Sequence, residues 1–369
     1  MARRMIDASS SSSSSSDPQS YVLSAAESRA IFERDIVPAE LGAILFPPPS
    51  QPNGTTTTTT TTDVTTWTPL AVLLVGQTGA GKTRTAPAIR HALEYLRGSH
   101  AAHFVADTYK TYHPSYRALL GGPRPSLASP ATAPDARRWL AMAATRAASA
   151  RADVLLESAA RHPADFAELV RVLRDAGYRV EVAVLAVPAA LSRLGILARF
   201  YDDGEARGGG GGGGRMPVRL TPRAVHDASY EGLLEAAAFV EASGAVDQVV
   251  VVRRGNMVAY ANERVGTGGG WRKGGGGVVA AVRAERERPL TDEERAGAEA
   301  TLRKLRDMNV PGLESQLVEI EELLEPLLGD IDNWAYTPLR PLSLPRSAQD
   351  EHFDIEAGLR LGMTSLLLI

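Results

Sequence analysis

A short glycine-rich segment of the chain carries the residue types that bind phosphate. Residues 76–83 read G-Q-T-G-A-G-K-T, which fits the pattern G-x-x-x-x-G-K-[ST]. Glycines let backbone N–H groups close around phosphate oxygens at the positive end of a following helix. Lys82 is placed to neutralise the β- and γ-phosphates, and Thr83 to offer a hydroxyl to Mg²⁺. The predicted phosphate-binding residues are Gly76, Gln77, Thr78, Gly79, Ala80, Gly81, Lys82 and Thr83.

Two acidic residues follow later apolar runs of the chain. Asp107 comes directly after residues 103–106, and Glu157 comes directly after residues 154–156. Ligands of parallel α/β sheets bind at the carboxyl ends of the strands. We therefore expect Asp107 to accept the proton of an attacking hydroxyl near the γ-phosphate. Glu157 is expected to hold an acceptor hydroxyl or a metal-bound water, with Arg161 gripping a phosphate, although an acid at a strand end can also be only a cap.

Short apolar runs that alternate with helical patterns must position these residues. This alternation predicts a parallel sheet of about five strands flanked by helices, an α/β fold of the P-loop NTPase kinase type. Residues 249–253 and 257–260 read as a hairpin at the sheet edge, with Arg253 and Arg254 on its surface. The expected strands span residues 70–75, 103–106, 154–156, 180–187 and 249–252, and the expected helices 86–97, 136–150 and 163–176.

Composition narrows the class of protein. The formal net charge of −3 argues against a broad nucleic-acid-binding surface, and the absence of cysteine excludes disulfides and thiolate metal sites. No apolar run has the roughly 20 residues that a membrane span needs, and the N-terminus has no secretory pattern. We therefore expect a soluble cytoplasmic protein that does not enter membranes.

Several separated motifs, in order, resemble those of the zeta toxin family. They are the phosphate-binding segment, D-T-Y-K-T-Y-H-P-S-Y at 107–116, E-S-A-A-R at 157–161, R-F-Y at 199–201, H-D-A-S-Y-E-G-L at 226–233 and V-V-V-V-R-R-G-N at 249–256. The resemblance covers about residues 67–263. It implies a kinase that uses ATP and Mg²⁺ to phosphorylate the sugar of UDP-N-acetylglucosamine.

The resemblance also implies roles for individual residues. Lys82 and Asp107 would be catalytic, with Asp107 as the general base. Arg199 and a second arginine, Arg219 rather than Arg215, would clamp the triphosphate from a mobile lid near residues 199–223. The residues that would meet the substrate are Lys110, His113, Glu157, Ser158 and Arg161.

Two positions depart from the family pattern. Lys110 stands where the family has arginine, which keeps the charge but loses the planar fork. Ala159 stands where the family has threonine, and the neighbouring Ser158 is the candidate to replace its hydroxyl. Two alternatives to the nucleotide-sugar kinase therefore stay open: a kinase of another small polyol or of a polynucleotide end, and an ATP-binding regulator whose kinase activity has decayed.

Low-complexity runs divide the chain around the kinase-like region. Charged amphipathic helices are expected at 284–306 and 312–328, and Ser24 with Glu27 predicts a helical capping box. Bacterial members of the family are held inactive by a helical antitoxin, so we hypothesise that a terminal helix of this chain inhibits it in cis. The predicted domains are a disordered serine-rich segment 1–20, a helical arm 21–50, a threonine-rich linker 51–66, the kinase domain 67–263, a glycine-rich linker 264–279 and a helical extension 280–369.

Overall fold

The computed structural model describes residues 17–45, 68–205, 220–266, 269–275, 277–329, 339–347 and 349–363. The chain divides into two compact units. The smaller unit comprises Met1–Ala39 and Ala106–Met142, and the larger unit comprises Glu40–Val105 and Ala143–Ile369. The predicted threonine-rich linker at 51–66 lies outside the described residues, as does the glycine run at 208–214.

One mixed sheet forms the centre of the larger unit. Its seven described strands lie in the order β2-β3-β1-β4-β5-β6-β7. The first five are mutually parallel, and β6 and β7 are added antiparallel at one edge. The predicted α/β fold and the hairpin are therefore confirmed. The strands are β1 (Leu70–Gly76), β2 (Ala102–Val105), β3 (Val154–Ser158), β4 (Arg179–Leu185), β5 (Gln248–Arg253), β6 (Met257–Glu263) and β7 (Arg340–Pro341).

Strand β1 lies between β3 and β4, and every residue of it is buried. Such a strand needs apolar side chains on both faces, which the sequence L-A-V-L-L-V-G supplies. Its register pairs Leu74 with Glu157 and Gly76 with Leu185. The phosphate-binding segment therefore leaves the sheet beside the end of β3.

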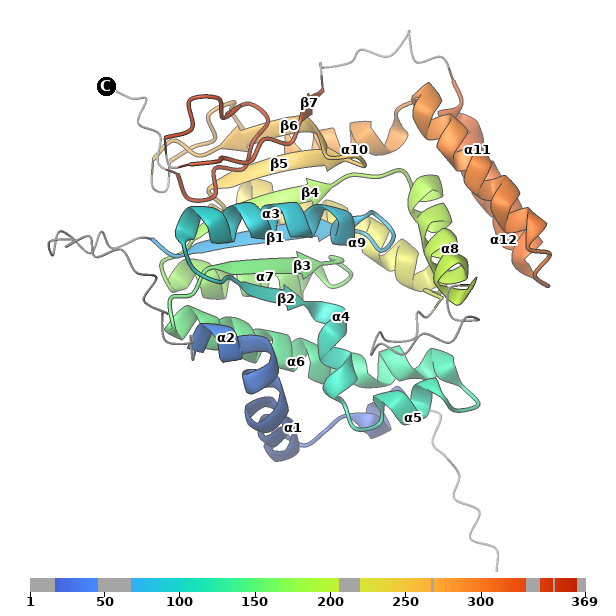
Figure 1. The fold of residues 1–369 in the computed structure, drawn as a ribbon, viewed down its shortest axis with the longest axis horizontal. Coiled ribbons are helices and arrows are strands. Elements are labelled where there is room, and N and C mark those ends of the chain that lie inside the picture. The colour runs from blue at the N-terminus through green and yellow to red at the C-terminus, as the bar shows by residue number, and fades with distance from the viewer. Residues whose placement is uncertain are drawn as a thin grey trace, which may run out of the picture. The chain divides into compact units, whose positions relative to one another are not determined.

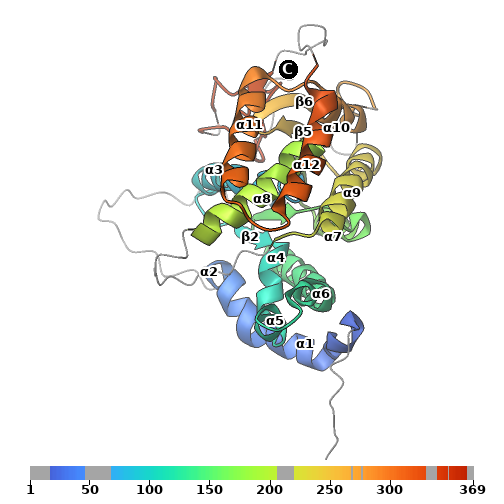
Figure 2. The ribbon, with the colours of Figure 1, turned by 90° about the vertical axis from the view of Figure 1, so that its right-hand side faces the viewer.

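Helices cover both faces of this sheet (Figures 1 and 2). Helix α3 lies on one face and helices α7 and α9 on the other, whereas α8, α11 and α12 lie beyond the carboxyl ends of the parallel strands. Helix α10 packs against α9 and β5. The bounds are α2 (Gly42–Leu45), α3 (Lys82–Arg97), α7 (Pro163–Asp175), α8 (Ala189–Glu205), α9 (Arg223–Ala242), α10 (Val278–Glu287), α11 (Asp292–Asp307), α12 (Leu313–Leu324) and the 3₁₀ turn η5 (Glu325–Leu327).

The C-terminal helices belong to the core of the larger unit. Leu302 of α11 and Leu317 of α12 lie in the same buried cluster as Val72 of β1. The helix expected over residues 284–306 is wrong, because two helices occupy this stretch. Pro289 follows the end of α10, and Thr291 caps α11 through a capping box.

The smaller unit is helical. Its N-terminal part is fixed by the predicted capping box between Ser24 and Glu27 and by a 2.8 Å hydrogen bond from Trp139 Nε1 to the carbonyl of Ser28. None of the described helices in either unit is long and apolar enough to cross a membrane. The elements of the smaller unit are η1 (Pro18–Tyr21), α1 (Ala25–Ile31), α4 (Ala106–Tyr109), η3 (Lys110–Tyr112), α5 (Tyr116–Leu120) and η4 (Pro125–Leu127). Two further elements, η2 (Phe32–Leu41) and α6 (Ala128–Ser149), belong partly to each unit.

Candidate functional site

The segment of residues 76–83, called the phosphate loop below, contains two positions whose backbone conformation only glycine adopts easily. Gly79 and Gly81 have φ angles of +83° and +103°. A Cβ atom on Gly79 would lie 2.1 Å from the carbonyl oxygen of Ser192, so this position also excludes any side chain sterically. Helix α3 then begins at Lys82 without a side-chain cap. Its first N–H groups can therefore be satisfied by a bound anion.

Lys82 reaches back over the phosphate loop. Its Nζ donates to the carbonyl oxygens of Gly76, at 2.5 Å, and Gln77, at 3.3 Å. The next residue, Thr83, is exposed on the first turn of α3. One hydroxyl together with phosphate oxygens and water is the kind of ligand set that Mg²⁺ takes in nucleotide sites. The loop residues thus fit both a polyphosphate and Mg²⁺.

A buried polar network supports the phosphate loop from α8 and α9. The Gln77 side chain is fully buried, and its Nε2 donates to the Val187 carbonyl at 2.6 Å and lies 3.4 Å from Ser192 Oγ. Ser192 Oγ lies 2.8 Å from Nε2 of His226, whose Nδ1 lies 2.9 Å from Asp227. Burial lowers the pKa of His226, against the opposing effect of Asp227. We conclude that a neutral imidazole forms part of the loop's support.

Two further side chains hold the loop by its backbone. Ser229 Oγ accepts from the N–H of Thr78 at 3.1 Å, and Arg254 donates to the carbonyl of Gly79 at 2.7 Å. Sequence reasoning missed both of these residues and also Ser192. The position of Arg254, directly after the parallel strand β5, could have indicated a role at the site, because ligands bind at the carboxyl ends of such strands. Its expected place on the hairpin surface is wrong, and its neighbour Arg253 is buried against Glu285.

Glu157 lies where β3 approaches its end and is buried. His103, on the neighbouring strand β2, places its Nε2 2.9 Å from Glu157 Oε1, a partner that the sequence did not suggest. Ser158 Oγ accepts from the N–H of Ala160, which has a φ of +52°. The Ser158 hydroxyl therefore stabilises a tight turn, and Arg161 follows that turn, half-buried.

The remaining acceptor-side residues lie in the smaller unit. Asp107 is on α4 with its side chain 82% exposed, and Lys110 Nζ lies 2.5 Å from its Oδ1 and 3.0 Å from Ser129 Oγ. His113 is buried: its Nε2 lies 3.0 Å from the Tyr21 carbonyl, and its Nδ1 accepts from the Ser115 N–H. Both ring nitrogens of His113 thus have structural partners, and its role toward a substrate stays a prediction.

Of the two predicted clamp residues, Arg199 lies among the described residues and Arg219 does not. Arg199 is exposed on α8. Arg219, like Arg215, lies outside the described residues. Both clamp roles stay predictions.

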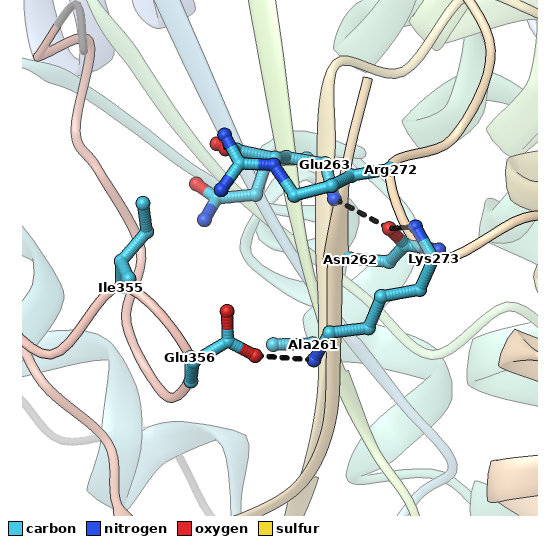
Figure 3. A pocket seen from close by; sticks show the side chains of 8 residues that line it. Ala261, Asn262, Glu263, Arg272, Lys273, Ile355 and Glu356 are labelled. Atoms are coloured by element: carbon cyan, nitrogen blue, oxygen red, sulfur yellow. Dashed lines mark hydrogen bonds and ion pairs between the residues drawn. The ribbon is translucent and has the colours of Figure 1, made fainter. Parts of the chain in front are cut away.

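Two surface pockets in the larger unit include charged residues among those that line them. The first, at the antiparallel sheet edge, holds an ion pair of 2.5 Å between Lys273 and Glu356, with Glu263 paired to Arg272 (Figure 3). Because its acids and bases neutralise one another, we assign it no ligand. The second lies between α8, the start of α9 and α12. It is lined by Arg193, Ile196, Leu197, Thr221, Arg223, His226, Gln316 and Ile320.

Comparisons with known proteins agree with this architecture. The family model described as zeta toxin matches residues 55–265. A structure from the PezAT chromosomal toxin–antitoxin system of the human pathogen Streptococcus pneumoniae is similar, with a TM-score of 0.55 and 16% identity, covering 82% of this chain and 98% of that one. A complex of AvrRxo1-ORF1 with AvrRxo1-ORF2 is less similar, with a TM-score of 0.40 and 13% identity over 71% of this chain and 77% of that one. No curated protein matches the sequence.

Proposed function

Because this chain belongs to the zeta toxin family, we propose that it is a kinase that transfers the γ-phosphoryl group of ATP to a hydroxyl of a nucleotide-sugar such as UDP-N-acetylglucosamine. The observation that carries this proposal is the geometry of the phosphate loop. Gly79 and Gly81 adopt left-handed backbone conformations, and Lys82 folds over the loop that they shape. A loop that merely joined β1 to α3 would need neither feature.

The proposed reaction is an in-line displacement at phosphorus. The acceptor hydroxyl oxygen forms a bond to the γ-phosphorus, the bond from that phosphorus to the bridging oxygen breaks, and ADP leaves with the electron pair. Asp107 accepts the hydroxyl proton, and Lys82 stabilises negative charge on the phosphates. Mg²⁺, when bound near Thr83, would neutralise phosphate charge. Arg199 and Arg219 are proposed to complete the cationic clamp.

The acceptor is the least constrained part of this proposal. Ser158 is the candidate to replace the hydroxyl missing at Ala159, yet its oxygen already accepts from the N–H of Ala160. A hydroxyl that accepts one hydrogen bond still has its proton to donate, so Ser158 stays the candidate. The alternatives, in which another small polyol or a polynucleotide end is the acceptor or the protein binds ATP as a regulator, rest on the departures at Lys110 and Ala159. Glu157 and Arg161 remain the proposed acceptor-binding residues, with Lys110 and His113 proposed beside Asp107.

The decisive experiment measures transfer from γ-labelled ATP to UDP-N-acetylglucosamine, with Asp107→Asn as the matched variant. We expect phosphorylated sugar from the wild-type protein and at least about a hundredfold less from the variant, the usual scale of general-base catalysis. Bound ATP without transfer to any tested hydroxyl would instead support the regulator. Equal rates for the two proteins would exclude Asp107 as the base.

A residue of α12 makes contacts that suggest how a terminal helix could inhibit the kinase in cis. Glu319 Oε2 accepts from Arg193 at 2.7 Å and from Arg223 at 2.9 Å. Arg193 precedes the predicted lid segment 199–223 by six positions, and Arg223 is its last residue. We propose that Glu319 restrains that segment by holding Arg193 and Arg223 together. Turnover that is unaffected by loss of the Glu319 charge would contradict this restraint.

A further inference from the structure

A buried arginine of α10 contacts the phosphate loop from outside the family match. Arg286 is 4% exposed and lies beyond the matched residues 55–265. Its guanidinium packs over the ring of Tyr230, with Cζ 3.6 Å from the ring centroid. One nitrogen donates to Oε1 of Gln77 at 3.3 Å. Arg286 is therefore in direct contact with the second residue of the loop.

Among the residues that the structure describes, no carboxylate pairs with the charge of Arg286. Its Nε and one terminal nitrogen are buried without any hydrogen-bond acceptor, and within the described part of the chain it pairs with no carboxylate. Burial is the main cause that lowers its pKa to about 10, with the charge of Arg283 acting in the same direction. Burying an unpaired cation destabilises a fold. Some other contribution must therefore account for a cation at this place.

A second arginine, Arg254, also contacts the phosphate loop. Among the described residues, Arg254 donates to the carbonyls of Gly79 and Leu191. Burial, followed by the charge of Arg84, lowers its pKa, and the charge of Glu294 opposes this shift. Carbonyl groups are neutral, so they do not balance the charge of Arg254. The phosphate loop is thus contacted by two partly or fully buried arginines, and of these Arg286 lacks a described carboxylate partner whereas Arg254 feels the charge of Glu294.

We propose that Arg286 is a positioning residue for the polyphosphate of the nucleotide, and that the bound phosphates supply the negative charge its environment lacks. It acts through Gln77, the loop residue to which it donates. This inference rests on the proposed function, since it takes ATP as the ligand. It makes α10, which lies outside the family match, a component of the nucleotide site.

The test compares Arg286→Met with Arg283→Met in the full chain. Both variants remove one positive charge from α10, but Arg283 is exposed. Two quantities are measured for each protein: the thermal midpoint without nucleotide and the Kd for Mg·ATP by calorimetry. We expect Arg286→Met to keep or raise the midpoint of the ligand-free protein, because an uncompensated buried charge is gone. We expect its Kd to rise about tenfold, a typical scale for a lost interaction with a charged group. Arg283→Met should change both quantities much less, because Arg283 is exposed and water screens its charge.

A purely structural arginine would behave in the opposite way. If Arg286→Met lowers the ligand-free midpoint by several degrees and leaves the Kd unchanged, the inference is overturned. Arg286→Lys guards against misfolding of the methionine variant: because lysine retains the charge, its Kd should lie closer to the wild-type value, and a Kd as weak as that of the methionine variant would contradict the electrostatic role. Failure of the wild-type protein to bind Mg·ATP would refute the proposed kinase itself, and is thus distinguishable from failure of this inference alone.

Discussion

Two arginines that are two positions apart near the end of α10 have opposite electrostatic environments. Arg288 is 1% exposed, and its guanidinium binds Glu285 at 3.0 Å and Glu294 at 2.6 Å. Arg286 is similarly buried but contacts an aromatic ring and an amide oxygen. The difference teaches that burial alone does not reveal the role of a charged residue. Arg288 is balanced within the fold, whereas the charge of Arg286 is left for a ligand to balance.

The balanced arginine belongs to a larger group, which we call the paired corner: Arg253, Glu285, Arg288 and Glu294. Glu285 also accepts from Arg253 at 2.7 and 2.9 Å, so that the corner joins the end of β5 to α10 and α11. Two arginines and two carboxylates leave it without net charge. We therefore expect changes in the paired corner to affect stability, and changes behind the phosphate loop to affect ATP binding.

The largest effect on stability should come from Glu285→Gln. This change leaves Arg253 and Arg288 buried beside a neutral amide, so the free energy of unfolding should fall by about 3–5 kcal/mol. Urea unfolding followed by circular dichroism measures it. The matched control is Glu287→Gln, an exposed residue of the same helix that should have little effect. A loss of stability no larger than that of the control would remove the distinction between the two regions.

A smaller effect should appear in the way the stability of the fold depends on pH. Burial by itself would raise the pKa of Glu294, but hydrogen bonds and charge from Arg288 outweigh this effect and lower the pKa below its ordinary 4.5. A carboxyl with a lowered pKa stabilises the fold above its unfolded-state pKa, and that stabilisation is lost as pH falls through the folded-state pKa. Urea midpoints between about pH 7 and about pH 3 should decline more steeply for the wild-type protein than for Glu294→Gln. Parallel profiles would show that Glu294 does not couple stability to pH.

The smallest effect on stability should come from Glu319→Gln, because this carboxylate is 40% exposed. It pairs Arg193 of α8 and Arg223 of α9, of which Arg223 also pairs with Asp227 at 3.4 Å. Loss of the Glu319 charge breaks the link between the two arginines and should raise turnover if α12 restrains the lid segment. The phosphoryl-transfer assay measures this, with Glu322→Gln on the same helix as the control. Identical turnover in the two variants would leave Glu319 as a surface contact only.

The features that the sequence predicted are those encoded by neighbouring residues. The phosphate loop, the position of Glu157 near the end of β3, the capping box at Ser24 and the β5–β6 hairpin each depend on a few consecutive positions. Asp107 lies on α4, shortly after β2 ends at Val105. Local patterns of apolar and glycine residues determine such features directly. The parallel sheet could be predicted for the same reason, since its strands are short, apolar and separated by helices.

The features that the sequence did not predict depend on contacts between distant positions. Arg286 and Gln77 are 209 positions apart, and no pattern in a single sequence connects them. His103 is paired with Glu157 only because β2 lies beside β3 in the sheet. The helix break at Pro289 was predictable in principle, because proline lacks the N–H that a helix interior requires. The burial of Arg253 was not, because its partner lies on another element.

The way Glu181 is satisfied has a consequence for how the chain is made in the cell. This carboxylate is fully buried on β4, and it accepts from the backbone N–H groups of Leu361 and Gly362, about 180 positions later. During synthesis, β4 and the phosphate loop beside it leave the ribosome long before those groups exist. A nascent chain that ends before residue 361 therefore keeps the contact of Glu181 with Arg179 on the same strand but lacks these two backbone donors. Glu181 is thus translated about 180 residues before the groups that complete its hydrogen bonding, and the phosphate loop beside its strand is translated earlier still.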